Sequence, residues 1–224
     1  WPKLYNMTAK SARGDRDERA RLQLLNKFID QLSQSKFDKD LGLALLSEFV
    51  HNTRAKASFF TLLLREDALV RDLILLFSAS PYLGGIIASR PELIDSYLYR
   101  RQDPYSENIT VLLEELTERR LLNEIIGTIE FLNSKDTEKL TTSLSNTADE
   151  ICQTLLNNLV SEYGPSEIEL FCLGKWGSLE LGIRSDLDFI FVTNEAPTQN
   201  DHRIAKRFIS RLTDKYRGGQ LYPI

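Results

Sequence analysis

One segment, residues 170–192, constrains the fold of this chain more than any other, because it places two acids inside mostly apolar sequence. It reads LFCLGKWGSLELGIRSDLDFIFV, in which a glycine-rich break separates two apolar runs and the second run contains Asp186 and Asp188. Carboxylates in apolar surroundings are unfavourable unless they are paired or bind cations. Residues two apart in a strand point to the same side. We therefore expect the two acids to share one face, with Leu187 and Phe189 packed on the other.

This spacing suits two-metal phosphoryl-transfer chemistry. Positions two apart on a strand are separated by roughly 6.5 Å along it. Their carboxylates can lean together onto metal ions about 3.5–4 Å apart. The alternative for an isolated Asp-x-Asp is a solvated strand end or a helix cap. Because a Gly-Ser pair precedes the acids and apolar residues flank them, we predict that Asp186 and Asp188 bind metal.

The break itself, Gly174-Lys175-Trp176-Gly177-Ser178, offers groups that bind phosphate. Gly177 allows the backbone to approach a phosphate closely, and Ser178 has both an N–H and a hydroxyl to donate. Lys175 is either a cation for the same phosphates or an ordinary surface lysine. The alternative for Gly177 and Ser178 is a tight turn without a ligand.

Other residues near the acids have two interpretations each. Ser185 contacts the nucleotide or only supports the turn before Asp186. Trp176 stacks on an adenine or, as is more common for such an aromatic residue, packs in the core. We interpret the Arg119-Arg120 pair as part of a solvated helix face rather than a binding patch.

Helical periodicity dominates the first part of the chain. From residue 17 onward, apolar residues recur at three- and four-residue spacing, which predicts a helical bundle within 1–103. We expect Asp67 to cap one helix and Ser80 to cap the next, with a proline at the first helical position. A break at 100–104 ends the bundle, because Pro104 disfavours a preceding helix.

Two long helices and then a sheet are predicted after this break. Residues 104–164 contain helices at about 106–132 and 137–163, and Gly127 in the first suggests a close helix contact. The apolar period then changes to two within 165–224. The predicted elements there are strands at 167–173 and 187–193, a helix from about 204 that ends near Gly218-Gly219, and a further strand at 220–224.

A Gly-Ser turn followed closely by an apolar-flanked Asp-x-Asp resembles the DNA-polymerase-beta-like nucleotidyltransferases. More narrowly, GKWGSLELGIRSDLDFIFV resembles the motif GKxGGxELxxxSDLDLxF of the glutamine synthetase adenylyltransferases, bifunctional enzymes with two nucleotidyltransferase halves. It departs from that motif at Trp176, Ser178 and Phe189. The sequence at 78–95 is similar to the family pattern ASPxLAxxLxRxPxLLD, and with Glu-Leu-Gly at 180–182 it is closer to the C-terminal, adenylylating half.

The resemblance implies an α+β fold, in which a mostly helical N-terminal region precedes a small mixed nucleotidyltransferase-type sheet with flanking helices, truncated at its C-terminus. It implies three parts, namely a helical bundle at 1–103, two long helices at 104–164 that pack on the catalytic part, and a partial nucleotidyltransferase domain at 165–224.

The resemblance also implies a reaction, the transfer of AMP from ATP to a tyrosine hydroxyl of glutamine synthetase, which regulates nitrogen assimilation. Mg²⁺ would be the cofactor. The implied catalytic and metal-binding residues are Asp186 and Asp188, and the implied nucleotide-binding residues are Gly177, Ser178, Lys175 and Ser185. The alternatives are the opposing half, which removes AMP by phosphorolysis, and a non-catalytic docking module for glutamine synthetase or a PII-type signal protein.

The family pattern LYxxDxRLRP carries a third metal-binding Asp, and this sequence matches its start at 221–224. The third acid would come directly after Ile224. We therefore expect the 224-residue chain alone to be weak or inactive, as a piece of a longer enzyme. Its first residue, a tryptophan rather than an initiator methionine, agrees with that expectation.

Composition favours a cytoplasmic protein that binds neither nucleic acid nor membrane. The net charge of −4 argues against a partner bound through its phosphate backbone. No apolar run approaches the length of a membrane span, and the N-terminal residues are not typical of a signal peptide. The only two cysteines, Cys152 and Cys172, lie in apolar patterns and are expected to be reduced core residues.

Overall fold

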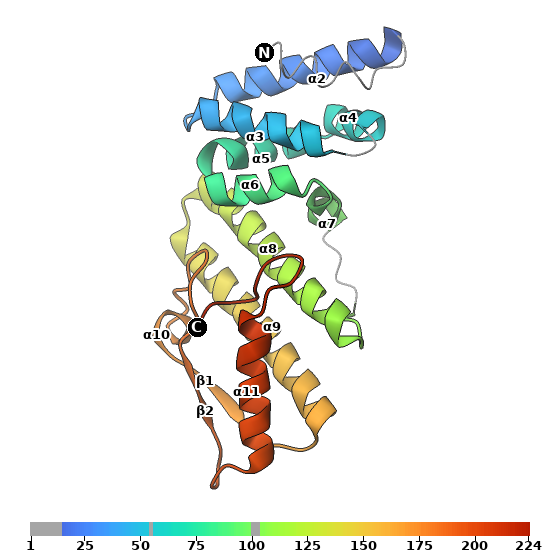
Figure 1. The fold of residues 1–224 in the computed structure, drawn as a ribbon. Helices are drawn as coiled ribbons and strands as arrows, with labels where there is room; N and C mark the ends of the chain where they lie inside the picture. The colour runs from blue at the N-terminus through green and yellow to red at the C-terminus, as the bar shows by residue number, and fades with distance from the viewer. Residues whose placement is uncertain (1–14, 54–55, 100–103) are drawn as a thin grey trace. The chain divides into compact units, whose positions relative to one another are not determined.

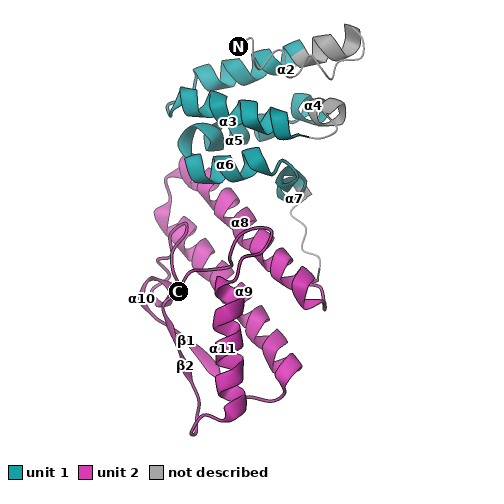
Figure 2. Ribbon diagram, viewed as in Figure 1, with its two compact units in different colours: residues 1–101 teal, residues 102–224 magenta. Residues whose placement is uncertain are grey.

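A computed structural model describes residues 15–53, 56–99 and 104–224. The chain has an α+β fold and divides into two compact units, residues 1–101 and 102–224 (Figure 2). None of the helices in the described ranges combines the length and the apolar composition of a membrane span. The predicted break at 100–103 lies outside these ranges. The predicted three-part division at residues 103 and 164 stays a prediction.

The first unit is helical, as predicted (Figure 1). Its described helices are α2 (Asp15–Ser33), α3 (Lys39–Asn52), α4 (Lys56–Arg65), α5 (Asp67–Ala79), α6 (Pro81–Ser89) and α7 (Leu93–Tyr99). The predicted cap at Ser80 is confirmed, because its side chain accepts the Leu83 N–H and Pro81 follows it. The predicted cap at Asp67 is wrong. Asp67 is already helical, and its carboxylate pairs with Lys27 at 2.5 Å instead of capping.

The second unit combines four helices with a small sheet in its described residues (Figure 1). The elements are α8 (Ile109–Ser134), α9 (Thr137–Tyr163), β1 (Glu169–Cys172), α10 (Gly174–Gly177), β2 (Phe189–Val192) and α11 (Gln199–Thr213). Helix α9 has the predicted bounds, set by Asp136 as N-cap and by Gly164, at φ +97°, as C-cap. Helix α8 begins three residues later than predicted, because the Asn108 side chain caps it.

Helices α8 and α9 approach each other closely at Gly127, which confirms the predicted contact. Gly127 is buried, and a Cβ built on it would lie 2.8 Å from Cδ1 of Leu140. Further along the same pair, Asn123 Nδ2 donates to Thr147 Oγ1 at 2.8 Å. The two helices thus form a packed support for the elements that follow them in sequence.

Strands β1 and β2 pair antiparallel, with Phe171 opposite Ile190. The predicted sheet was mixed, but these two antiparallel strands are the whole sheet within the described residues. Residues 220–224 form no strand, contrary to prediction. Instead a single backbone bond joins this segment to the sheet region, from Leu187 N–H to Pro223 O at 3.0 Å.

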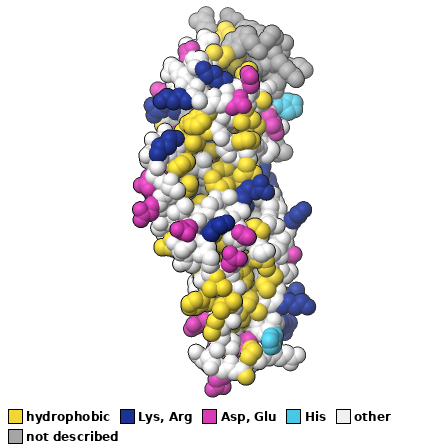
Figure 3. All heavy atoms as spheres, turned by 90° about the vertical axis from the view of Figure 1, so that its left-hand side faces the viewer, with side chains coloured by type: hydrophobic (Ala, Val, Ile, Leu, Met, Phe, Trp, Pro, Cys, Tyr) yellow, Lys and Arg dark blue, Asp and Glu magenta, His cyan; other side chains and the backbone are white. Residues whose placement is uncertain are grey.

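One face of the sheet packs into the core of the second unit. Phe189 and Phe191 meet the Phe208 ring edge-on, at centroid distances of 5.7 and 5.6 Å. The other face is exposed, and Phe171 and Ile190 keep 62% and 49% of their surface accessible. Hydrophobic side chains gather on this face, in the lower part of Figure 3. Cys152 is buried and Cys172 half-buried, and both are free thiols, as predicted.

Candidate functional site

Asp186 and Asp188 lie in the connecting segment just before β2, which has no assigned secondary structure. Both are exposed, whereas Leu187 between them is 2% exposed and belongs to the core. The predicted alternation is therefore confirmed: the two acids share the open face, and Leu187 and Phe189 share the packed one. Their role as metal ligands stays a prediction.

The backbone around the acids is fixed from both sides. On one side, Leu173 N–H at the end of β1 donates to the carbonyl of Asp188 at 2.8 Å. On the other side, Leu187 N–H donates to Pro223 O at 3.0 Å. The two acids thus lie between the end of β1 and the segment 221–223, which limits how far their backbone can move.

Gly174 forms one wall of the site, and sequence reasoning did not single it out. Its φ is +53°, a left-handed conformation that favours glycine. A Cβ built on it would lie 2.6 Å from Oδ2 of Asp188. The Asp188 carboxylate therefore lies against the first residue of α10, in space that only glycine leaves open. The signal in the sequence was a glycine that begins the break directly after an apolar strand.

Gly177 and Ser178 form a tight turn after Gly174. A Cβ on Gly177 would lie 2.7 Å from the carbonyl oxygen of Cys172, so glycine is required by the chain's own backbone. The Gly177 N–H donates to Leu173 O, and the Ser178 N–H donates to Gly174 O. The Ser178 hydroxyl is exposed and lies 2.9 Å from Oε2 of Glu180. The turn is therefore structural at least, and its contact with phosphate stays a prediction.

The loop before Asp186 contains two hydrogen bonds of its own. The Gly182 N–H donates to Ser185 Oγ at 3.0 Å, and the Ser185 N–H donates to Gly182 O at 3.1 Å. Ser185 therefore supports the turn, and direct contact with nucleotide stays a prediction for it. Arg184, within the turn, has the left-handed φ of +62°. Lys175 is exposed on α10, as either of its interpretations requires.

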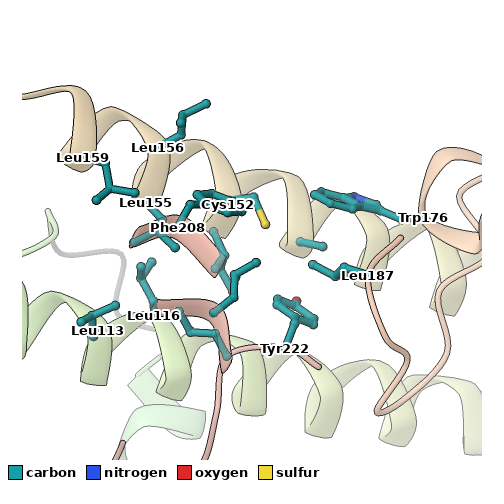
Figure 4. Close-up of a cluster of buried hydrophobic side chains, with 14 of the residues drawn as sticks. Leu113, Leu116, Cys152, Leu155, Leu156, Leu159, Trp176, Leu187, Phe208 and Tyr222 are labelled. Carbon is teal, nitrogen blue, oxygen red and sulfur yellow. The ribbon is translucent and has the colours of Figure 1, made fainter. Parts of the chain in front are cut away.

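Trp176 is a packing residue. Its side chain is 2% exposed, its indole N–H donates to Asp149 Oδ1 at 2.8 Å, and its ring meets Phe189 edge-on at 6.1 Å. Burial in the core leaves no ring face open for an adenine, so the stacking interpretation is wrong (Figure 4).

The carboxylates of Asp186 and Asp188 fit a hard divalent cation such as Mg²⁺, which prefers oxygen ligands. In the part of the chain that the structure describes, neither carboxylate has an ion-pair partner or a hydrogen-bond donor. No group of three or more His, Cys, Asp or Glu residues is placed to hold a metal there. The remaining oxygens would come from nucleotide phosphates, water or a further acid.

A buried ion pair lies behind the loop, and the sequence did not reveal it. Arg120 Nη1 lies 2.7 Å from Glu124 Oε1, and the two side chains are 8% and 4% exposed. The interpretation of Arg120 as part of a solvated face is therefore wrong, because α8 turns it toward Tyr222 in the core. Burial raises the pKa of the Glu124 carboxyl, against the opposing charge of Arg120.

Known proteins with related sequences identify the family. The family model described as glutamate-ammonia ligase adenylyltransferase matches residues 70–222. A protein of Bradyrhizobium sp. (strain ORS 278), named bifunctional glutamine synthetase adenylyltransferase/adenylyl-removing enzyme, is 24% identical over 240 residues, covering 90% of this chain and 24% of the relative. Proteins of the same name from Agrobacterium fabrum and Methylococcus capsulatus are 25% and 23% identical and cover 79% and 92% of this chain, which spans 21% and 27% of them.

The chain thus spans about a quarter of the length of these relatives. The matched residues 70–222 include the acids, the Gly-Ser turn and the whole of the segment 78–95. This match covers more than half of the chain and agrees with the resemblance found in its motifs. The chain belongs to the glutamate-ammonia ligase adenylyltransferase family.

Proposed function

We propose that this chain carries part of the active site of an adenylyltransferase that moves AMP from ATP to a tyrosine hydroxyl of glutamine synthetase. Such an enzyme regulates nitrogen assimilation in the cytoplasm. The observation that carries the proposal is the pair Asp186 and Asp188, two exposed carboxylates on one face without a partner among the described residues. The relatives are named for this activity and for adenylyl removal.

In this proposal the two acids hold Mg²⁺, which supplies positive charge against the triphosphate when it is bound. Gly177, Ser178 and Lys175 orient the phosphates, and Ser185 keeps the turn before Asp186 in place. The tyrosine oxygen forms a bond to the α-phosphorus as the bond to the pyrophosphate oxygen breaks, and the hydroxyl proton leaves to a base or water. Orientation and charge stabilisation account for most catalysis of this kind.

The hydrogen bond between Leu187 and Pro223 supports a role for a third acid. It places the segment 221–223 beside Asp186 and Asp188, so a carboxylate that follows this segment, as the family pattern has it, can join theirs. We expect a chain extended past Ile224 to be more active than the 224-residue form for this reason.

Phosphorolytic removal of AMP from glutamine synthetase is the second candidate function, favoured by the adenylyl-removing activity in the relatives' names. It needs the same acids, because a phosphate oxygen bonds to the same phosphorus while the bond to the tyrosine oxygen breaks, which gives ADP and the free tyrosine hydroxyl. A docking role for the helices toward glutamine synthetase or a PII-type protein is the non-enzymatic alternative. In that case the acids have no part in binding nucleotide.

Transfer of labelled AMP from α-labelled ATP to glutamine synthetase tests the proposal. The assay uses the 224-residue chain, the extended chain, and the extended chain with Asp186→Asn and Asp188→Asn. Asp214→Asn is the matched control, because it removes an exposed carboxylate at the end of α11.

We expect labelling by the extended chain, loss of labelling with the two acids replaced, and no change with Asp214→Asn. Release of AMP from pre-modified glutamine synthetase on addition of phosphate, without labelling, would assign the removing reaction instead. Activity in neither direction, with ATP binding unaffected by Asp188→Asn, would leave the docking role and refute the assignment of the acids.

A further inference from the structure

The buried pair Arg120–Glu124 contacts both segments that flank the acids. On one side, the backbone N–H of Arg184 points at Glu124 Oε1 over a long 3.5 Å. On the other side, the Arg120 guanidinium lies over the Tyr222 ring, 5.7 Å from its centroid. Tyr222 is next to Pro223, which accepts the N–H of Leu187 between the two acids. The Arg120–Glu124 pair thus contacts both the loop that leads into Asp186 and the segment 221–223, which is hydrogen-bonded to Leu187.

The pair is poorly arranged to contribute stability. Glu124 Oε2 and Arg120 Nε are buried and have no hydrogen-bond partner within the described residues. Burying two charges is unfavourable, and the loss is recovered only when the remaining polar atoms are satisfied. Apolar residues of similar size often serve as well or better in such a place. The pair is therefore better explained as a group that holds the nearby backbone in position than as one that adds to the stability of the fold.

The loop before Asp186 contains a strained backbone conformation that a contact from Glu124 can stabilise. Arg184 has φ +62°, which for a non-glycine residue is a sparsely populated conformation. Conformations of this kind persist only where the surroundings impose them. For Arg184, the described contact of the backbone N–H is with Glu124. Burial raises the pKa of Glu124, and the charge of Arg120, the backbone N–H of Arg184 and the charge of Arg184 oppose this rise.

We propose that Arg120 and Glu124 are positioning residues, which fix the loop 182–185 and the segment 221–223 and thereby set the position of Asp186 relative to Asp188. The inference rests on the proposed function for the use of the acids, but the position of the loop can be measured without it. Residues that orient metal ligands from behind typically change metal affinity by about 10–100-fold when they are replaced.

Hydrogen–deuterium exchange of the 224-residue chain tests the loop directly. The variants are Glu124→Gln and the double variant Arg120→Met with Glu124→Met, which removes both charges and leaves no unpaired one. Glu130→Gln is the matched control, because Glu130 lies on the same helix and its partner Lys139 is exposed. We expect faster exchange at the amides of 182–187 in both test variants and unchanged exchange in the control. Unchanged exchange in the double variant overturns the proposal.

Binding of Mn²⁺ with ATP, measured by calorimetry, tests the consequence for the acids. We expect affinity about tenfold weaker in the double variant, even where its stability equals or exceeds that of the parent chain. Leu159→Ala is the stability control, since it opens a cavity at a fully buried α9 position. Loss of affinity in Leu159→Ala as large as in the double variant reduces the pair to a structural role and overturns the proposal.

The two proposals fail in distinguishable ways. If the parent chain binds Mn²⁺ and ATP, and Asp186→Asn abolishes binding, but the double variant binds as well as the parent, only the positioning role is refuted. If the parent binds no nucleotide, even when extended past Ile224, the proposed function fails, and the exchange experiment still decides whether the pair fixes the loop.

Discussion

Replacing Gly174 by alanine should separate backbone strain from displacement of a catalytic carboxylate. Gly174 has φ +53°, where an L-residue loses about 1–2 kcal/mol relative to its usual conformations. The new Cβ would also lie 2.6 Å from Asp188 Oδ2. To restore an ordinary contact of roughly 3.5 Å, the carboxylate has to move by about 1 Å.

These two effects predict different losses. The strain alone lowers the free energy of unfolding by about 1–2 kcal/mol, because the carboxylate can swing away from the new methyl group. The displacement acts on function, since misplacing a catalytic group by about 1 Å can reduce the rate by as much as ~100-fold. We expect Gly174→Ala to fold, to lose this modest stability, and to transfer AMP about 10–100-fold more slowly in the extended chain.

Gly164→Ala is the control. Gly164 has φ +97° and ψ 179°, a conformation nearly restricted to glycine, and a Cβ there would meet no atom within 4 Å. It should therefore lose at least as much stability in urea denaturation followed by circular dichroism, with little change in AMP transfer. Equal losses of transfer in the two variants, or full activity in Gly174→Ala, would refute the reasoning about Asp188.

Two further predictions concern the elements that support the site. Trp176→Phe should lower the free energy of unfolding, measured in urea, by about 1–2 kcal/mol, because the hydrogen bond from the indole N–H to Asp149 is lost. Asp149→Asn keeps an acceptor oxygen and should lower this free energy by less. A larger loss in Asp149→Asn than in Trp176→Phe would contradict the assignment of this hydrogen bond. The hydroxyl of Ser166, together with the Thr198 N–H and hydroxyl, lowers the pKa of Asp201 below its usual 3.8. A carboxyl with a lowered pKa stabilises the fold above its unfolded-state pKa and loses this contribution as the pH falls through the folded-state value. The urea midpoint should therefore fall as acid is added below about pH 4, and less steeply in Asp201→Asn; parallel profiles would contradict the prediction.

Local patterns in the sequence predicted much of the fold. Helix α9 was bounded correctly because its stripe of apolar residues, its N-cap and its terminal glycine all lie within one segment. The faces of Asp186, Leu187 and Asp188 were predicted from strand alternation, although the assigned strand begins only at Phe189. Residues 220–224 were apolar enough to predict a strand, but a strand needs a partner strand along its length. Within the described residues this segment instead makes one backbone bond to Leu187 and one to Leu212 in α11.

What the sequence could not predict depends on contacts between distant segments. Arg120 and Glu124 are four residues apart on α8, a spacing that is common on solvated helices. Their burial follows from Tyr222, about a hundred residues later, and from the loop at Arg184. The role of Gly174 likewise depends on Asp188 across the sheet.

These contacts explain how two exposed acids can be held without direct partners. Like charges on one face repel each other, so their carboxylates would separate if the backbone allowed it. The backbone is instead fixed by β1 at Asp188, by Pro223 at Leu187 and, in our proposal, by the Arg120–Glu124 pair behind the loop. Because the backbone is fixed, the repulsion persists until a divalent cation binds and relieves it. The repulsion between the acids should therefore lower the stability of the metal-free chain, and its relief should add to the free energy of metal binding. Asp186→Asn should stabilise the metal-free chain and weaken metal binding.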